Sequence, residues 1–591
     1  MNKWRALRTV AVGGSQGARL EVWRHHRLWF MAEAGYLIDG FENRPGAHPW
    51  QGEHLGKWLH AATLTWLMTG DDRLARALAK SVERLLATQL PNGYLGTYGP
   101  EQTFVALPED VPLAQRHDDM DRGKAKKRRG GWDTWTHRYN LYGLLTFERV
   151  FPNEAVVDAC RRMADLLIEV YGEGGADLTH YGTRKGISAT TLLESIVMLY
   201  ERTSDARYLA FAEHIVERME ANPGLRLMSS LLTGGGVVHP GEGKGYQIMA
   251  NLLGYLRLYR CTGKNEYLRT AVNGWNEIKA KHLLVTGGPW TRHTDYNGNR
   301  ECFARAEDFD PWEVSVEGCC DTTWIQLCLQ LFEVLGESKY LDAAEATLYN
   351  SLHGHQHADG MRWCYYTAPN EVEPAYVDTI TCCASSMPRA MEMAAAHLVG
   401  EIDGHLSIGT LAACRVELSE AFGGGVLTVE GDFPADPTTE IRFETRVRRT
   451  FTCEFRLPDG VVLRQVRVNG AGVDVTTNER GFFELRRRWE RGDVLAIEAE
   501  PELRMDVQEG EGGQRWIAFS QGPVALAQKV SSIPGDEPFE GRTPAEALAM
   551  LRRSTDGSHS IADTGIALVP YHQACTDSSG PRTYFRCAYA D

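Results

Sequence analysis

One short pattern occurs three times in the first two thirds of the chain and constrains the fold more than any other feature. The copies begin at Leu199, Leu258 and Leu331. In each copy an apolar run ends, a polar or glycine turn follows, and an aromatic–leucine pair opens the next run, as expected where one helix stops and another starts. Helical hairpins that cannot bury their apolar faces alone must stack on one another. We therefore predict a closed toroid of about six helical hairpins, with an open solenoid as the alternative.

The pattern changes at about residue 398, where short β-rich runs separated by turn signals begin. Ile441 to Val447 alternates polar and apolar residues, and Pro458-Asp459-Gly460 and Asn469-Gly470 are turn sequences. This spacing is typical of a β-sandwich. We interpret residues 501–513 as a seam, that is, the boundary between the sandwich and a second β-unit. We predict a helical catalytic domain over residues 1–397, a β-sandwich over 398–512 and a second small β-domain over 513–591, with one early strand at Leu20 to Trp23.

The overall charge and the cysteine content limit the class of partner. A formal net charge of −15 over 591 residues argues against a nucleic-acid groove or an anionic membrane surface, and favours a neutral substrate. The sequence contains no uninterrupted apolar run of about eighteen residues, and no apolar segment typical of a secretory signal near its start. Thirteen irregularly spaced cysteines indicate reduced thiols rather than disulfides. We expect a cytoplasmic protein.

Two pairs of adjacent cysteines, Cys319-Cys320 and Cys382-Cys383, are the strongest chemical signal, and Glu317 stands two residues before the first pair. Three thiolates and one carboxylate suit tetrahedral zinc. We predict that Glu317, Cys319, Cys382 and Cys383 hold Zn²⁺. The alternative is that these cysteines are small buried apolar residues, which is the interpretation we keep for Cys320.

Several other residues are candidates for chemistry or for binding. A metal-bound thiolate that keeps its nucleophilicity can attack an electrophilic carbon, and Glu301, sixteen residues before Glu317 (317 − 301), could then protonate the leaving group. An ordinary loop carboxylate is the alternative. His137, flanked by aromatic residues, and Tyr366 suit a sugar-binding cleft, or else belong to the core. His239 and Lys244 form a weaker candidate pair.

The segment from His117 to Gly131 is densely charged with both signs. It could form a flap over the central cleft. Charge blocks of this kind are more often solvated loops, and that is the interpretation we favour.

Taken together, these motifs resemble those of the β-L-arabinofuranosidase family, glycoside hydrolase family 127. The matching stretches are Gln51, Lys57-Trp58-Leu59, Gly93 to Tyr98, His137, Glu301, Glu317-Gly318-Cys319, Tyr366, Cys382-Cys383 and Arg389. The resemblance implies an (α/α)6 barrel followed by β-sandwich modules, and a zinc ion held by the glutamate and three cysteines named above. It further implies Cys382 as the nucleophile and Glu301 as the acid/base, with substrate contacts from His137, Tyr366 and Gln51.

One departure from the family pattern bears on the substrate. Where the family has a histidine before the helix at Leu192 to Tyr200, this chain has Ser188-Ala189-Thr190-Thr191. The resemblance as a whole implies a retaining exo-glycosidase that releases a terminal furanoside-type sugar from a small oligosaccharide. Another pentose, a deoxysugar or a branched acidic sugar such as aceric acid stays open. A sugar epimerase or lyase on the same toroid, and a non-catalytic carbohydrate-binding protein, are the alternatives; a homodimer is also left open.

Overall fold

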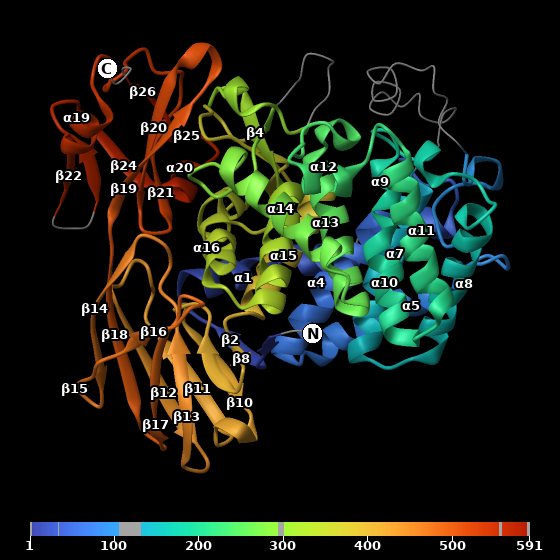
Figure 1. Cartoon of the computed structure of the whole chain (residues 1–591), viewed down its shortest axis with the longest axis horizontal. Coiled ribbons are helices and arrows are strands. Elements are labelled where there is room, and N and C mark those ends of the chain that lie inside the picture. The colour runs from blue at the N-terminus through green and yellow to red at the C-terminus, as the bar shows by residue number, and fades with distance from the viewer. Residues whose placement is uncertain (1–2, 34, 106–131, 293–300, 555–557, 588–591) are drawn as a thin grey trace.

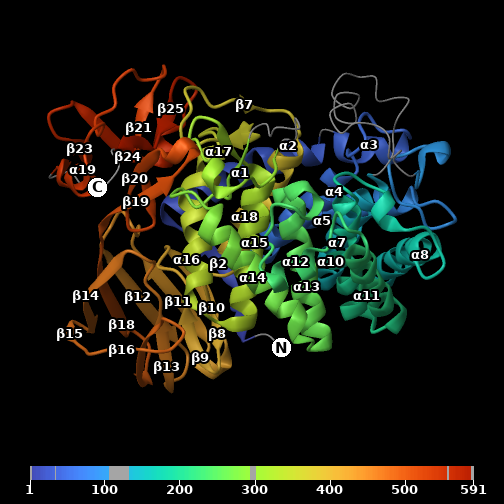
Figure 2. The same cartoon turned by 45° about the horizontal axis from the view of Figure 1, so that its top comes forward.

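The computed structural model describes residues 3–33, 35–105, 132–292, 301–554 and 558–587. Within them, six long helices form a closed inner ring (Figures 1 and 2). These are α4 (Glu53–Thr69), α7 (Asp133–Val150), α10 (Leu192–Thr203), α13 (Gly245–Thr262), α15 (Gly318–Leu335) and α18 (Cys382–Ala395). Each contacts the next, and α18 closes the ring against α4. The predicted toroid is confirmed. The charged segment 117–131 lies outside the described residues, so neither interpretation of it is tested.

Outer helices connect the inner ones: each returns the chain to the end of the ring at which the next inner helix begins. They are α5 (Asp72–Ala87), α8 (Glu154–Tyr171), α11 (Ala206–Ala221), α14 (Asn265–Lys281) and α16 (Ser338–Thr347), and α1 (Gly14–His25) lies against α18. The three sequence copies fall on the turns between inner and outer helices, where Ser204, Gly263 and Gly336 have φ values of 56°, 71° and 73°. A left-handed residue ends a helix, which explains the recurring turn.

Burial differs between the two rings. The outer helix α5 buries one stripe, formed by Leu74, Leu78, Val82 and Leu85, whereas the inner helix α4 is buried on nearly all sides. Because the outer helices return the chain, the inner helices run parallel. Their N-terminal ends therefore meet at one end of the ring.

The shorter helical elements connect these hairpins or lie in the C-terminal part. They are α2 (Arg27–Glu33), α3 (Tyr36–Glu42), α9 (Ile187–Thr190), α12 (Leu227–Thr233), α17 (His353–His355), α19 (Pro544–Ala549) and α20 (Tyr571–Ala574), with a π-helical turn at Leu348–Leu352. The predicted strand at Leu20 to Trp23 is wrong, because these residues belong to α1. Leu20 and Trp23 are three residues apart and both are buried, which is a helical period.

Two sheets form the predicted β-sandwich. One has the order β1-β8-β9-β13-β17-β16 and the other β15-β14-β18-β12-β11-β10-β2. Their strands are β1 (Trp4–Ala6), β2 (Thr9–Val12), β8 (Val399–Ile402), β9 (His405–Ile408), β10 (Cys414–Leu418), β11 (Gly425–Glu430), β12 (Thr438–Thr445), β13 (Arg449–Phe455), β14 (Val461–Val468), β15 (Ala471–Gly472), β16 (Thr476–Thr477), β17 (Phe483–Trp489) and β18 (Val494–Pro501). The first two strands come from the start of the chain, so the sandwich joins residues far apart in sequence.

A third sheet, of order β19-β20-β21-β24-β23-β22 with β25 and β26 alongside, follows the sandwich. Its strands are β19 (Leu503–Glu509), β20 (Arg515–Gln521), β21 (Val524–Val530), β22 (Leu551–Arg553), β23 (His559–Ile561), β24 (Ile566–Pro570), β25 (Gly580–Arg582) and β26 (Phe585–Cys587). Within the predicted seam at 501–513 lies β19, which pairs with β20 along its length. Its alternation of Leu503, Met505 and Val507 with polar residues is a strand signal.

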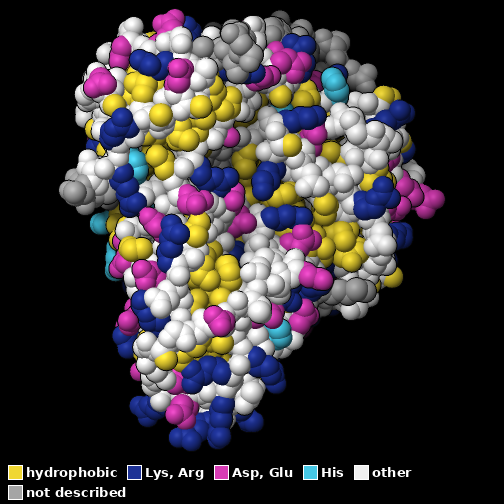
Figure 3. Space-filling view, turned by 60° about the vertical axis from the view of Figure 1, so that its left-hand side comes forward, with side chains coloured by type: hydrophobic (Ala, Val, Ile, Leu, Met, Phe, Trp, Pro, Cys, Tyr) yellow, Lys and Arg dark blue, Asp and Glu magenta, His cyan; other side chains and the backbone are white. Residues whose placement is uncertain are grey.

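Two small sheets lie within the toroid's loops. β3 (Thr291–Arg292), β4 (Val314–Glu317) and β6 (Tyr366–Thr367) form one, and β5 (Trp363–Cys364) and β7 (Tyr376–Val377) form the other. Figure 3 shows acidic and basic side chains interspersed with apolar patches on the face seen there, one of them broad and in the upper part of the view. None of the helices in the described part of the chain has both the length and the apolar character needed to cross a membrane.

Candidate active site

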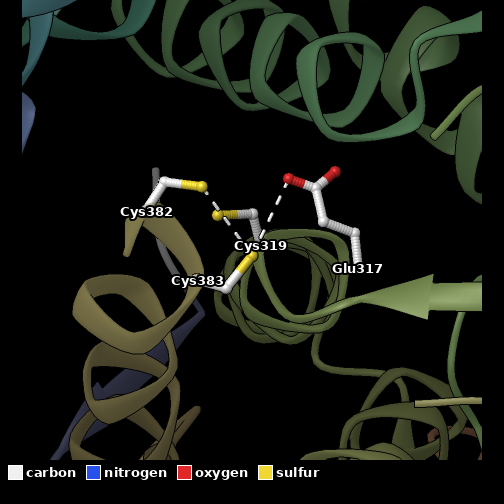
Figure 4. Close-up of side chains that lie close together, drawn as sticks. All are labelled: Glu317, Cys319, Cys382 and Cys383. Carbon is white, nitrogen blue, oxygen red and sulfur yellow. Dashed lines mark hydrogen bonds between the residues drawn. The ribbon is translucent and has the colours of Figure 1, made fainter. Parts of the chain in front are cut away.

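Glu317, Cys319, Cys382 and Cys383 converge at the end of the ring where the inner helices begin (Figure 4). Glu317 ends β4 and caps α15, and Cys319 lies in the first turn of that helix. Cys382 and Cys383 open α18. One ligand atom from each residue lies within 4.8 Å of the others. The junction of β4 with α15 and the start of α18, which lie far apart in sequence, thus deliver four ligand-type atoms to one point.

The spacing and chemistry of these atoms fit one tetrahedral ion. The Sγ atoms of Cys382 and Cys383 are 3.9 Å apart, and Sγ of Cys383 is 3.9 Å from Oε1 of Glu317. Zn–S bonds of about 2.3 Å at tetrahedral angles place two sulfurs about 3.8 Å apart. Thiolates select soft or borderline ions, whereas Mg²⁺ and Ca²⁺ prefer oxygen ligands. The residues present therefore fit a zinc-type site.

The sulfur atoms differ in exposure and in charge. Cys319 and Cys383 are buried, whereas Cys382 is partly exposed. Burial raises the pKa of the Cys319 thiol, but hydrogen bonds from Cys382 and Cys383 and the nearby Lys57 ammonium outweigh it and hold that pKa well below its usual value. The first turns of two helices add positive dipole ends that favour negative charge here. Cys382 is thus the most solvent-exposed sulfur of the cluster.

Lys57 in α4 is a functional candidate to which the sequence analysis assigned no role of its own. Its Nζ is 3.9 Å from Sγ of Cys319, 3.2 Å from the carbonyl oxygen of Cys382 and 3.0 Å from Oε2 of Glu53. The side chain is fully buried, and burial is outweighed by the surrounding negative groups, which raise the pKa of Lys57. A lysine inside an otherwise buried helix is the signal that could have identified it.

Glu301 lies beside the cluster, as its predicted role requires. The Tyr366 hydroxyl donates a hydrogen bond to Oε1 of Glu301, and Lys244 Nζ donates one to Oε2. Lys244 Nζ also donates to Oε2 of Glu317 at 2.9 Å. Burial raises the pKa of Glu301, but the Lys244 ammonium and these hydrogen bonds hold it below its usual value. Burial, together with the charge of Glu301, raises the pKa of Glu317 to about 8.

Tyr365 is a second residue that the sequence did not single out. Its hydroxyl oxygen lies 2.9 Å from Sγ of Cys382. The neighbouring Tyr366 pairs through its backbone with Glu317, since β6 lies beside β4. The two adjacent tyrosines therefore contact different groups of the site: Tyr365 contacts the Cys382 thiol, and Tyr366 contacts the Glu301 carboxylate. The two adjacent tyrosines in the sequence were the signal that could have identified Tyr365.

The predicted substrate contacts His137 and Gln51 are buried, and their polar atoms are bonded to backbone groups. His137 Nε2 accepts from Leu95 N–H at 3.2 Å, and its Nδ1 lies 2.7 Å from the carbonyl oxygen of Asp133. Burial, opposed by that backbone bond, lowers the pKa of His137 to about 4. Gln51 Oε1 accepts from Ala47 N–H at 2.6 Å. Both substrate roles stay predictions.

Comparisons with known proteins identify the family and the fold. The family model for the β-L-arabinofuranosidase, GH127 catalytic domain matches residues 21–395, and the model for the GH127 middle domain matches residues 411–500. A solved GH127 β-arabinofuranosidase superposes with a TM-score of 0.76 at 16% identity, covering 99% of this chain and 98% of that one. A GH127 β-L-arabinofuranosidase from Geobacillus stearothermophilus T6 gives a TM-score of 0.74 at 16% identity, with 98% and 100% coverage.

A third solved structure, described as a glycoside hydrolase, gives a TM-score of 0.72 at 15% identity and covers 100% of this chain and 98% of its own. No curated protein matches the chain. At these identities the solved structures show a shared fold, while the two family models together span most of the sequence. The chain is thus a member of the β-L-arabinofuranosidase family, glycoside hydrolase family 127.

Proposed function

We propose that the protein is a retaining exo-glycosidase that removes a terminal furanoside-type sugar from a small oligosaccharide. One observation carries the proposal: the partly exposed sulfur of Cys382 belongs to the same cluster as Glu317, and Lys244 joins Glu317 to Glu301. A nucleophile and a proton donor thus flank one site, which is the arrangement that a double displacement at a sugar carbon needs.

In the first step, Sγ of Cys382 attacks the anomeric carbon as the bond to the departing oxygen breaks. Glu301 gives that oxygen its proton from its protonated form, which the Lys244 ammonium makes the minor form of the free site. In the second step the Glu301 carboxylate takes a proton from water, the water oxygen attacks the anomeric carbon, and Cys382 leaves as a thiolate. Two inversions retain the anomeric configuration. Zinc held by Glu317, Cys319, Cys382 and Cys383 would keep the thiols deprotonated and make sulfur a better leaving group.

The sugar itself is proposed only as a class. In place of the family's histidine, Ser188 accepts a hydrogen bond from the backbone N–H of Thr183 at 2.7 Å, and so serves a local turn. L-arabinofuranose is the reference sugar of the family, and a deoxysugar or a branched acidic sugar remains the alternative. A cytoplasmic location remains part of the proposal.

A panel of aryl furanosides and pyranosides, with zinc analysis of the same sample, tests this function. We expect release of one aryl sugar with retained configuration by NMR, about one zinc per chain, and loss of release in both Cys382→Ser and Glu301→Gln. If either variant keeps its activity, the assigned roles are wrong. An epimerase on the same toroid would instead tolerate Cys382→Ser and lose activity in His137→Ala.

A further inference from the structure

Lys244 stands between the two carboxylates of the site. Its Nζ donates hydrogen bonds to Oε2 of Glu301 and to Oε2 of Glu317, the second at 2.9 Å. The side chain is only 9% exposed, and those of Glu301 and Glu317 are 16% and 3% exposed. Two buried carboxylates near each other repel when both are ionised, so the ammonium between them sets their relative position.

The backbone fixes this lysine against Glu301. Lys244 faces Cys302 in an antiparallel bridge, with hydrogen bonds from Gly245 N–H to the Glu301 carbonyl at 3.1 Å and from Phe303 N–H to the Gly243 carbonyl at 2.7 Å. The two backbone segments that carry Lys244 and Glu301 are therefore joined by their own hydrogen bonds, in addition to the contact between the two side chains.

Both segments also adopt backbone conformations that are uncommon for residues other than glycine. Glu301 has φ of 65°, and Gly241, Glu242 and Gly243 have φ of 54°, 58° and 74° immediately before Lys244. A Cβ on Gly243 would lie 2.7 Å from the carbonyl oxygen of Val238 and 2.8 Å from that of Phe303. Such strain persists where the surrounding structure requires it, and it concentrates at functional sites.

An apolar residue would fill this position at a lower desolvation cost than a buried lysine. A cation is needed here if one carboxylate changes its charge during the reaction. When Glu301 is protonated, the Lys244 ammonium still forms an ion pair with Glu317. When Glu301 is a carboxylate, the ammonium forms ion pairs with both glutamates. Lys244 can thus hold Glu301 in each of its two states.

We propose, on the basis of the function proposed above, that Lys244 is the positioning residue of this active site, holding Glu301 toward the departing oxygen and Glu317 toward the metal. It acts through these carboxylates and does not touch the reacting atoms.

The test compares Lys244→Met and Lys244→Ala with the unchanged protein on aryl glycosides whose phenols differ in acidity. A misplaced acid slows departure of a poor leaving group more than that of a good one. We expect kcat/KM to fall about 100-fold for the poor leaving group, and by less than tenfold for the good one. Added alkylammonium ions should restore part of the Lys244→Ala loss by entering the space left by the side chain. Lys281→Ala, on the exposed face of α14, is the control and should behave as the unchanged protein.

Zinc affinity, measured by competition with a chromophoric chelator, supplies a readout independent of activity. We expect Lys244→Met to bind zinc about tenfold more weakly, as is typical when a ligand loses its outer hydrogen-bond partner, and Glu301→Gln to bind it normally. Equal loss on all leaving groups, or unchanged zinc affinity, would overturn the proposal. Because the unchanged protein, Cys382→Ser and Glu301→Gln are assayed alongside, failure of the glycosidase function shows as no release by the unchanged protein or as retained activity in those variants, whatever Lys244 does.

Discussion

The hydroxyl oxygen of Tyr365 lies 2.9 Å from Sγ of Cys382, the partly exposed sulfur of a cluster whose other two sulfurs are buried. A hydroxyl that donates to a thiolate stabilises its charge and fixes its direction. The neighbouring Tyr366 makes the corresponding contact with Glu301. Two consecutive residues therefore orient the proposed nucleophile and the proposed acid.

Tyr365→Phe is expected to lower kcat/KM about tenfold, since one hydrogen bond to a charged group contributes about 1.5 kcal/mol. The loss should be similar for good and poor leaving groups, because the nucleophile is affected in both cases. Tyr366→Phe provides the comparison: its loss should be larger for poor leaving groups. The same leaving-group profile in both variants would show that the two tyrosines do not divide the site in this way.

The two cysteines of the first pair are expected to differ. Cys319 belongs to the cluster, whereas Cys320 is absent from that group of convergent ligand atoms, and burial, together with the Glu317 charge, raises its pKa well above the usual value. Cys319→Ala should lose bound zinc, and Cys320→Ala should keep about one zinc per chain, as measured by atomic absorption. Zinc lost from Cys320→Ala but retained by Cys319→Ala would reverse the assignment.

The sequence predicted the ring and the ligand set; of the two cations beside the ligands, it singled out Lys244 only as a weaker candidate and gave Lys57 no role. The repeated turn at Ser204, Gly263 and Gly336 is a local signal, because a left-handed residue ends each helix. Adjacent cysteines are also visible locally. Lys57 approaches Cys319 only through folding, across 262 residues of sequence.

Local patterns also misled in two places. Leu20 and Trp23 suit a strand or a helix over four residues, and only packing against α18 decides for the helix. The strand β19 was hidden because its period-two pattern follows directly on β18. The predicted domain boundaries and the cytoplasmic location stay predictions.

Lys57→Met tests how much the buried Lys57 ammonium, next to Cys319 and Glu53, contributes to stability. It would leave Glu53, which is 1% exposed, without its ionic partner, and breaking a buried pair in this way costs about 3–5 kcal/mol. We expect a clear drop in the thermal unfolding temperature, with a large part recovered in Lys57→Met/Glu53→Gln, where the stranded charge is gone. A double variant no more stable than Lys57→Met would place the cost in contacts other than this pair.

Removal of the proposed zinc should destabilise the toroid, because the four residues that would hold it lie at the starts of α15 and α18. An ion present at a hundred times its dissociation constant contributes about 2.7 kcal/mol. Treatment with dipicolinate should therefore lower the unfolding temperature by roughly 2–4 °C, at about 1 °C per kcal/mol for a folding unit of this length. Zn²⁺ should restore the temperature and Mg²⁺ should not, since thiolates bind Mg²⁺ poorly. An unchanged unfolding temperature in chelator would contradict a structural contribution from the ion.

Asp133 gives a pH dependence that can be separated from the metal site. Its Oδ1 accepts from the Tyr94 hydroxyl and its Oδ2 from Phe104 N–H, and burial raises its pKa to about 7. A carboxyl whose pKa is higher in the folded state than in the unfolded chain stabilises the fold most at low pH, and this contribution is lost as the pH rises from about 4 to about 7. The slope is at most about 1.4 kcal/mol per pH unit.

Asp133→Asn resembles the protonated form at every pH. The variant should therefore match the unchanged protein near pH 4 and gain relative stability towards pH 7, as measured by unfolding temperatures across that range. Metal release at low pH affects both proteins alike, so the difference between them isolates Asp133. Thr233→Ala, at the exposed end of α12, removes a side chain that does not titrate; it is the control and should give a constant difference. A constant difference for Asp133→Asn as well would mean that its carboxyl titrates in the folded protein much as it does in the unfolded chain.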